Sequence, residues 1–149
     1  MRLALISDVV TGMFPQAIGL TTKGHSVGIL VPETLCPVRP VNLSVTCFPL
    51  PSLPDIFHKN TRIITSFPAR IPSLLDKFRP DIVHFENPRI HLFYPVYLWC
   101  KIHHKPLLTS AFGSAPSFIN KILYTMSDLT FDPAGKNPYA QTLESLLHP

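Results

Sequence analysis

Short apolar runs alternate along the chain with segments that place apolar side chains at helical spacing. Apolar runs of four or five residues are typical of strands buried on both faces of a sheet. Strands are therefore predicted at residues 3–6, 27–31, 82–85 and 106–110. Helical spacing marks residues 9–23, 71–78 and 90–103. Because strands alternating with helices form βαβ units, the pattern predicts an α/β fold, a Rossmann-like, mostly parallel sheet with helices on both faces.

Glycine and proline indicate where two of these helices end. Gly24 follows the first helical segment and is predicted to be its C-cap, although Pro15 and Gly19 weaken that helix. Pro80 disfavours a helical conformation for the residue before it, so the second helix should stop there and the next strand should begin soon after.

The middle of the chain is rich in proline. The sequence contains 17 prolines, which cluster between Pro32 and Pro72. Such clustering predicts a long irregular excursion. Within it, residues 43–48 form a plausible third strand, and residues 49–54 are predicted to be a non-helical loop because three prolines interrupt them.

The last part of the chain continues the same alternation. Residues 90–103 are apolar nearly all round, which predicts a helix in the interior or at an interface. With about a dozen residues this segment is too short to span a membrane. Ser117 is expected to cap a helix at residues 118–125, followed by a short strand at 128–131 and a closing helix at 140–147.

Length and composition describe a packed protein. The chain has 149 residues, of which 46% are hydrophobic and 15% charged, and this predicts one domain covering residues 1–149. Residues 1–7 are too short for a signal peptide, which favours a cytoplasmic protein. Cys36, Cys47 and Cys100 are odd in number and lack metal-ligand spacing, so reduced thiols and no metal are expected.

The net charge limits the class of partner. A formal charge of +4 and a pI near 9.1 fit either a plain solvated basic surface or an anionic partner. That partner would be a phosphorylated substrate or an acidic membrane surface with peripheral contact. No Lys/Arg run marks a nucleic-acid tract, so no nucleic acid is expected.

Polar side chains follow two of the predicted strands. Asp8 comes directly after the first, and His84, Glu86 and Asn87 lie in and after the strand at 82–85. In open α/β sheets, ligands bind outside the carboxyl ends of the strands. His84, with an ordinary pKa near ~6.5, could accept a hydroxyl proton there, or it could be a structural histidine. Glu86 and Asn87 could hold sugar hydroxyls or cap the following turn.

Several segments resemble one family. Residues 78–88 resemble the "PDIVHaH.P" segment of the acceptor-side N-terminal domain of GT-B glycosyltransferases of family 4, especially the sulfoquinovosyl- and mannosyltransferase-like branch. Four more pieces resemble the family in the correct order: "MRIaivSD", "rGHeV", "PlvaSyHtdfP" and "aDlvl.PS..t…L". They correspond to residues 1–8, 22–27, 105–116 and 127–143, so the resemblance covers almost the whole chain.

The resemblance implies a division of labour between two domains. The acceptor enters the N-terminal domain, a second domain binds the nucleotide sugar, and reaction occurs in the cleft between them without a metal or other cofactor. Carried onto this sequence, the resemblance and the strand-end positions together give six candidate acceptor-binding residues: Asp8, His84, Glu86, Asn87, Phe112 and Gly113.

Two departures from the family pattern bear on activity. Family members carry a glycine-rich loop between "SD" and the first helix, whereas here Asp8 runs directly into Val9. Without that loop, bare backbone amides are not available to approach a phosphate group. Phe112 stands where members have a histidine facing the reacting sugar, and a phenyl ring neither donates a hydrogen bond nor transfers a proton.

These features predict an acceptor domain that is inactive by itself. The chain stops at Pro149, about where the family crosses into its donor-binding domain, so that domain is expected to be absent and supplied by a separate chain. The expected partner is a sugar or glycolipid acceptor. One alternative is a non-catalytic protein-interaction module that uses residues 90–99 or the exposed face toward the second domain. Another is a free-standing nucleotide-binding protein. No Gly-x-Ser-x-Gly elbow or P-loop suggests a different chemistry.

Overall fold

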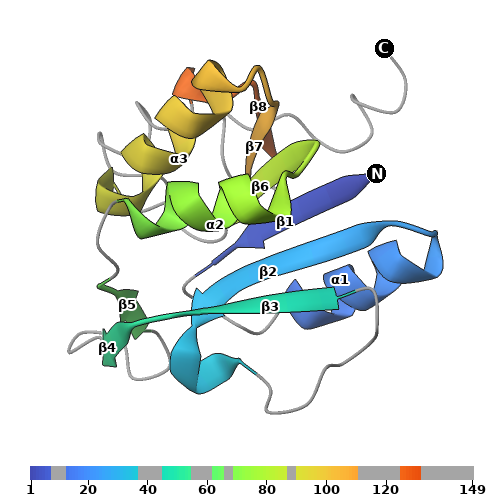
Figure 1. The fold of residues 1–149 in the computed structure, drawn as a ribbon, viewed down its shortest axis with the longest axis horizontal. Coiled ribbons are helices and arrows are strands. Elements are labelled where there is room, and N and C mark those ends of the chain that lie inside the picture. Colours follow the sequence, from blue (N-terminus) through green and yellow to red (C-terminus); the bar gives the residue numbers. More distant parts are fainter. Residues whose placement is uncertain are drawn as a thin grey trace.

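A six-stranded parallel sheet forms the centre of the molecule, in the order β3-β2-β1-β6-β7-β8 (Figure 1). The computed structural model describes residues 1–7, 13–36, 45–54, 62–65, 69–86, 90–110 and 125–131. The six strands are β1 Arg2–Ile6, β2 Ser26–Pro32, β3 Val45–Leu50, β6 Ile82–Glu86, β7 Leu107–Ser110 and β8 Leu129–Phe131. The α/β fold class predicted from the sequence is confirmed.

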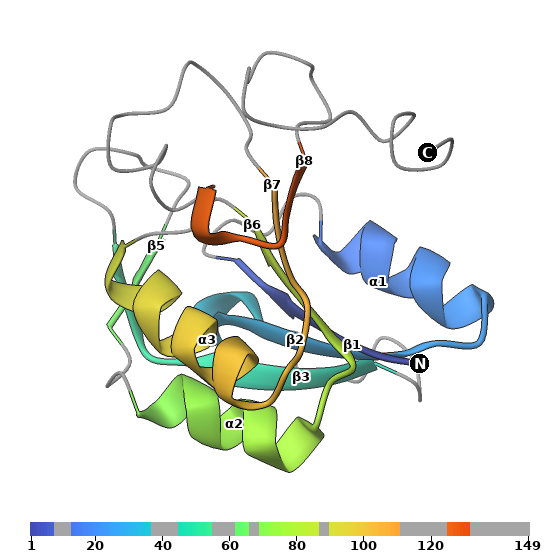
Figure 2. The same cartoon turned by 90° about the horizontal axis from the view of Figure 1, so that it is seen from above.

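Helices cover both faces of this sheet, as predicted. Figure 2 shows α1, Met13–Thr22, on one face, and α2, Arg70–Phe78, with α3, Ile90–Ile102, on the other. Side chains alternate along β1, so that Leu5 packs with α1 whereas Ala4 and Ile6 pack with α2 and α3. Each face therefore has its own apolar core, and the sheet separates the two.

The first helix ends at a glycine in the left-handed conformation. Gly24 has φ +81°, its N–H donates to Thr21 O at 3.0 Å, and the N–H of His25 donates to Leu20 O at 3.2 Å. This pair of bonds is a Schellman motif, which confirms Gly24 as the predicted cap. Pro15 lies in the first turn of the helix, where a missing N–H leaves no bond unmade.

The second helix turns sharply into β6. Its apolar face buries Ile71, Leu75 and Phe78. Arg79 follows with φ 53°, and its N–H donates to Leu75 O at 2.6 Å, so the chain leaves the helix just before Pro80. The predicted stop is confirmed.

The third helix is apolar on two sides but buried on only one. The side toward the sheet and α2 is buried and consists of Leu92, Phe93, Val96, Trp99 and Cys100. Tyr94, Leu98 and Ile102 are 44%, 54% and 72% exposed. The expected interior position thus holds for one face, and the other face is open in the described part of the chain. No helix among the described residues is long and apolar enough to cross a membrane.

One prediction for the proline-rich middle is wrong. Residues 49–54 do not form a loop: Pro49 and Leu50 complete β3, and β4 Ser52–Pro54 pairs antiparallel with β5 Arg62–Ile64. Within the described part of the chain, β3 lies at the edge of the sheet and pairs only with β2. A proline is tolerated there because an edge strand does not need every N–H.

Other predictions fall on the end of the chain. The strand expected at 128–131 is confirmed as β8. Of the helix expected at 118–125, only Thr125 is among the described residues, and it is helical. The helix expected at 140–147 lies outside the described residues.

Candidate functional site

The order of the strands reverses between β1 and β6. β2 and β3 lie on one side of β1, while β6, β7 and β8 follow on the other. In open α/β sheets the crevice at such a switch point, outside the carboxyl ends of the strands, is where ligands bind. Ile6 pairs with Phe85, so the next residues along the two strands, Ser7 and Glu86, lie at this point.

Buried polar side chains form a row across three neighbouring strand ends. Glu86 pairs with Ser110 at the end of β7, and Ser7 continues the row at the end of β1. Ser7 and Ser110 are 0% exposed and Glu86 is 5% exposed. In-register residues of a parallel sheet point to the same face, which here is the α1 side that also carries Leu5. We call Ser7, Glu86 and Ser110 the polar row.

His84 is anchored to the same row from within β6. Its Nε2 lies 3.0 Å from Ser110 Oγ. Burial lowers the pKa of His84 to about 4, so the imidazole is neutral near pH 7. Two expectations from the sequence are corrected: His84 lies in the middle of its strand rather than at the end, and its pKa is not the ordinary one near ~6.5. A neutral ring can orient a hydroxyl but carries no positive charge.

Glu86 is the last residue of β6 and stands where the sequence placed a candidate. The two oxygens of a carboxyl group can accept hydrogen bonds, so this side chain suits the hydroxyl groups of a sugar. Asp8, Asn87, Phe112 and Gly113 lie outside the described residues, and their roles stay predictions.

Ser110 is not among the site residues that the sequence predicts, and Ser7 occurs there only within the family piece "MRIaivSD". Both serines follow short apolar runs at the carboxyl ends of strands, which is the signal that could have found them. Their proximity to Glu86 depends on strand register, which the sequence does not display.

Among the described residues, no three His, Cys, Asp or Glu side chains gather as a metal-binding set would. The expectation of a metal-free site stays a prediction.

Comparison with known proteins identifies the family of the chain. The model of Glycosyltransferase Family 4 matches residues 11–147. The chain belongs to glycosyltransferase family 4. A search among curated protein sequences found no match.

Solved structures share the fold of this family 4 chain. MurG from Acinetobacter baumannii aligns with a TM-score of 0.61 and 14% identity, over 91% of this chain and 44% of MurG. The glycosyltransferase SsfS6 from Streptomyces sp. SF2575 aligns with a TM-score of 0.64 and 17% identity, over 95% of this chain and 53% of SsfS6. UDP-GlcNAc 2-epimerase from Methanocaldococcus jannaschii aligns with a TM-score of 0.58 and 16% identity, over 90% of this chain and 40% of the epimerase. The chain therefore spans about half the length of these proteins or less.

Proposed function

We propose that this chain is the acceptor-binding half of a glycosyltransferase that transfers a sugar from a nucleotide sugar to a glycan or lipid acceptor. The observation that supports this best is the polar row, which lies at the switch point of the sheet in a member of family 4. We assign it to the sulfoquinovosyl- and mannosyltransferase-like branch on the sequence pieces described above, and we expect it to work in the cytoplasm, in contact with a membrane surface.

In this proposal the described side chains hold the acceptor by its hydroxyl groups. The Glu86 carboxylate accepts hydrogen bonds from the hydroxyls, and its burial makes each such bond stronger than one in water. His84 Nε2 and Ser110 Oγ lie 3.0 Å apart, and these two side chains position the sugar ring of the acceptor against that carboxylate. Asp8, Asn87, Phe112 and Gly113 complete the proposed acceptor site.

The donor half comes from elsewhere in this proposal. Stabilising a diphosphate leaving group requires cationic or amide donors near the phosphates. The sequence lacks the glycine-rich loop that would bring amides close, and it has Phe112 in place of the family histidine. We therefore propose that residues 1–149 do not transfer sugar by themselves and act together with a donor-binding domain.

The test compares acceptor binding with transfer. Saturation-transfer NMR with alkyl mannosides measures binding to the purified chain, and Glu86→Gln should weaken it about tenfold because a charged hydrogen-bond acceptor is lost. Glu33→Gln is the matched control, because Glu33 is an exposed carboxylate on the short 3-10 helix η1, Glu33–Leu35. Equal binding by wild type and Glu86→Gln would contradict the acceptor assignment. Sugar transfer by the isolated chain would contradict its inactivity alone.

A second candidate function rests on α3. Its exposed residues Tyr94, Leu98 and Ile102 recur every four positions and so form one apolar stripe. This stripe supports the alternative of a non-catalytic module that binds another protein through the helix. Co-purification with a donor-binding chain favours the first proposal. The second is favoured if neither the wild type nor any variant binds the acceptor, and if a stable complex with another protein is lost in Leu98→Lys.

A further inference from the structure

A polar hollow lies at the amino ends of β6 and β7, whereas the polar row lies at the carboxyl ends of the strands. It has a volume of about 410 Å³ and is lined by Asp76, Arg79, Trp99, His103 and Lys105. These residues come from the carboxyl ends of α2 and α3, which lead into the amino ends of β6 and β7. A ligand here would not compete with one at the carboxyl ends of the strands.

The acidic group of the hollow is already engaged. The indole Nε1–H of Trp99 donates to Asp76 Oδ1 at 2.7 Å, and His103 Nε2 lies 3.4 Å from the same oxygen. The rings of Trp99 and His103 stack with centroids 4.5 Å apart and an interplanar angle of 24°. These contacts hold α2 and α3 together and give the hollow a preformed wall.

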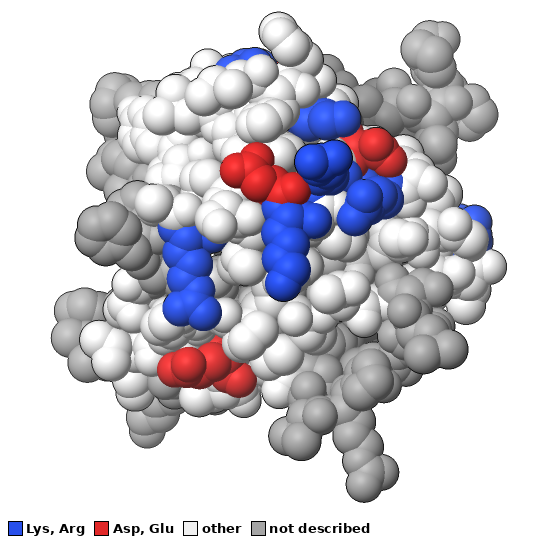
Figure 3. Space-filling view, viewed as in Figure 1, with Lys and Arg blue, Asp and Glu red and all other residues white. Residues whose placement is uncertain are grey.

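The hollow also has two basic side chains in its lining. Within the described part of the chain, neither Arg79 nor Lys105 forms an ion pair. Arg79 leaves the helix end in the left-handed conformation, φ 53°. Figure 3 shows Lys and Arg side chains gathered on this face near the end of α2.

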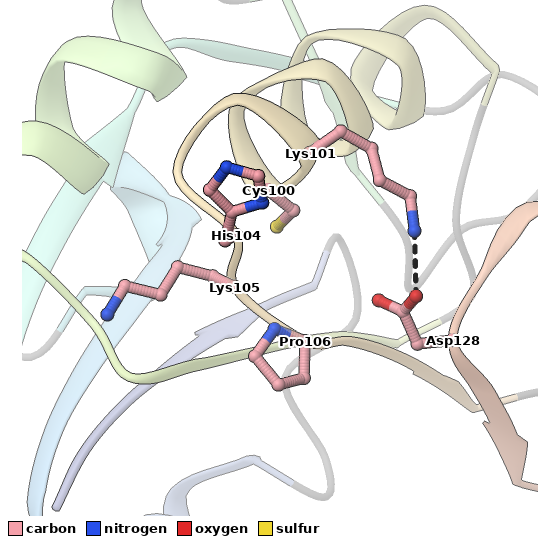
Figure 4. A pocket seen from close by; sticks show the side chains of 6 residues that line it. All are labelled: Cys100, Lys101, His104, Lys105, Pro106 and Asp128. Atoms are coloured by element: carbon pink, nitrogen blue, oxygen red, sulfur yellow. Dashed lines mark hydrogen bonds and ion pairs between the residues drawn. The ribbon is translucent and has the colours of Figure 1, made fainter.

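A neighbouring hollow shows the contrast. It is lined by Cys100, Lys101, His104, Lys105, Pro106 and Asp128. Its Lys101 is paired with Asp128 at 2.7 Å, whereas the side chain of Lys105 extends away from that pair (Figure 4). Lys105 also lies near enough to Asp81 to help lower the pKa of that carboxyl group, and its side chain lines the hollow that it shares with Arg79.

We propose that the hollow formed by Asp76, Arg79, Trp99, His103 and Lys105 binds a small phosphate monoester. The guanidinium of Arg79 offers a planar pair of donors to two phosphate oxygens, and the ammonium of Lys105 adds a second positive charge for a dianion. The imidazole of His103 supplies a polar edge, and the volume accommodates a phosphate with a small organic group. A cationic ligand is disfavoured, because it would meet the positive charges of Arg79 and Lys105.

Trp99 provides a direct reporter. It is the single tryptophan of the chain, so indole fluorescence and the indole N–H resonance both arise from the wall of this hollow. The full 149-residue chain is titrated with sn-glycerol 3-phosphate and with inorganic phosphate, at ionic strength matched with potassium chloride. A saturable change of the Trp99 signal is expected with the ester, and the chloride control should give none.

Charge variants decide whether the hollow or the general basic surface is responsible. Arg79→Gln together with Lys105→Gln should raise the dissociation constant for the ester at least tenfold, because two charged donors are lost. Lys77→Gln removes one charge from an exposed position on α2 outside the hollow and should change it less than twofold. If the double variant does not fold, Lys105→Gln alone carries the test, with about a threefold weakening expected.

Two results would overturn the proposal: no saturable signal with tens of millimolar ester, or equal weakening by Lys77→Gln and Lys105→Gln. Neither result bears on the acceptor site, because Glu86 lies at the carboxyl end of β6 and the hollow lies at the amino ends of the strands.

Discussion

His84 Nε2 lies 3.0 Å from Ser110 Oγ and joins two neighbouring strands on the α1 side of the sheet. Burial holds the ring in its neutral form, with a pKa of about 4. In the unfolded chain the same ring would have an ordinary pKa near ~6.5. The unfolded chain therefore binds more protons between these two values, and the free energy of unfolding must fall as the pH is lowered through this range.

This coupling predicts a pH-dependent stability. Between pH 7.5 and pH 4, His84 should cost the native state roughly 3 kcal/mol, because each unit of pKa difference corresponds to about 1.4 kcal/mol. Urea unfolding at several pH values measures the effect. The control is His84→Gln, which keeps a polar side chain beside Ser110 but does not titrate. Parallel pH profiles for the two proteins would refute the assignment.

Gly28 on β2 leaves room for the ring of Phe78. A Cβ at this position would come within 2.9 Å of Phe78 Cε1. The ring is confined by Phe48, with centroids 5.8 Å apart, and by the Arg2 guanidinium at 4.9 Å. Gly28→Ala should therefore lower the free energy of unfolding by about 1–3 kcal/mol. The control, Gly19→Ala on α1, has nothing within 4 Å of its new Cβ and should be neutral or stabilising. Equal effects of the two substitutions in chemical denaturation would argue against this packing.

Cys100 should resist alkylation in the folded protein. Burial, helped by the charge of Asp128, raises the pKa of its thiol to about 12. Because the thiolate is the reactive form, labelling with iodoacetamide at pH 8 should be on the order of a thousandfold slower than for a free cysteine. Mass spectrometry of the labelled protein follows each site, and labelling in guanidinium chloride shows that all three thiols are competent. Rapid labelling of Cys100 in the native chain would show that α3 opens easily.

Asp128 fastens the start of β8 to β7. Its Oδ2 accepts the N–H of Leu107 at 2.8 Å, and its own N–H donates to Leu107 O at 3.0 Å. Asp128→Ala leaves the buried strand end without an acceptor and should cost about 1–2 kcal/mol of unfolding free energy. Lys101→Met removes the exposed ion pair with the same carboxylate and the contact of the ammonium with the Tyr97 ring at 5.5 Å. Because both contacts are at the surface, thermal stability should stay nearly unchanged. A larger loss for Lys101→Met than for Asp128→Ala would reverse this interpretation.

Local sequence was sufficient for much of the fold. The apolar runs at residues 3–6, 27–31 and 82–85 correspond to β1, β2 and β6, because a strand buried on both faces must be apolar at every position. The helix ends at Gly24 and Arg79 are also predictable from the sequence, because each depends on neighbouring residues. Gly24 readily adopts the left-handed conformation of a cap, and Pro80 disfavours a helical conformation at Arg79. The strand conformation of Pro49 is not predictable locally, because tolerance of a proline depends on the strand being at an edge of the sheet.

The candidate sites also combine features set by local sequence with features set by tertiary packing. The sequence by itself determined the family and placed Glu86 at a strand end, because both depend on residue order. Only the tertiary structure brought Ser7, Glu86 and Ser110 into one row, lowered the pKa of His84, and set Trp99 on Asp76, which is 23 positions away. Strand register, burial and contacts between distant helices arise from the packing of the whole chain, and no local pattern of residues specifies them.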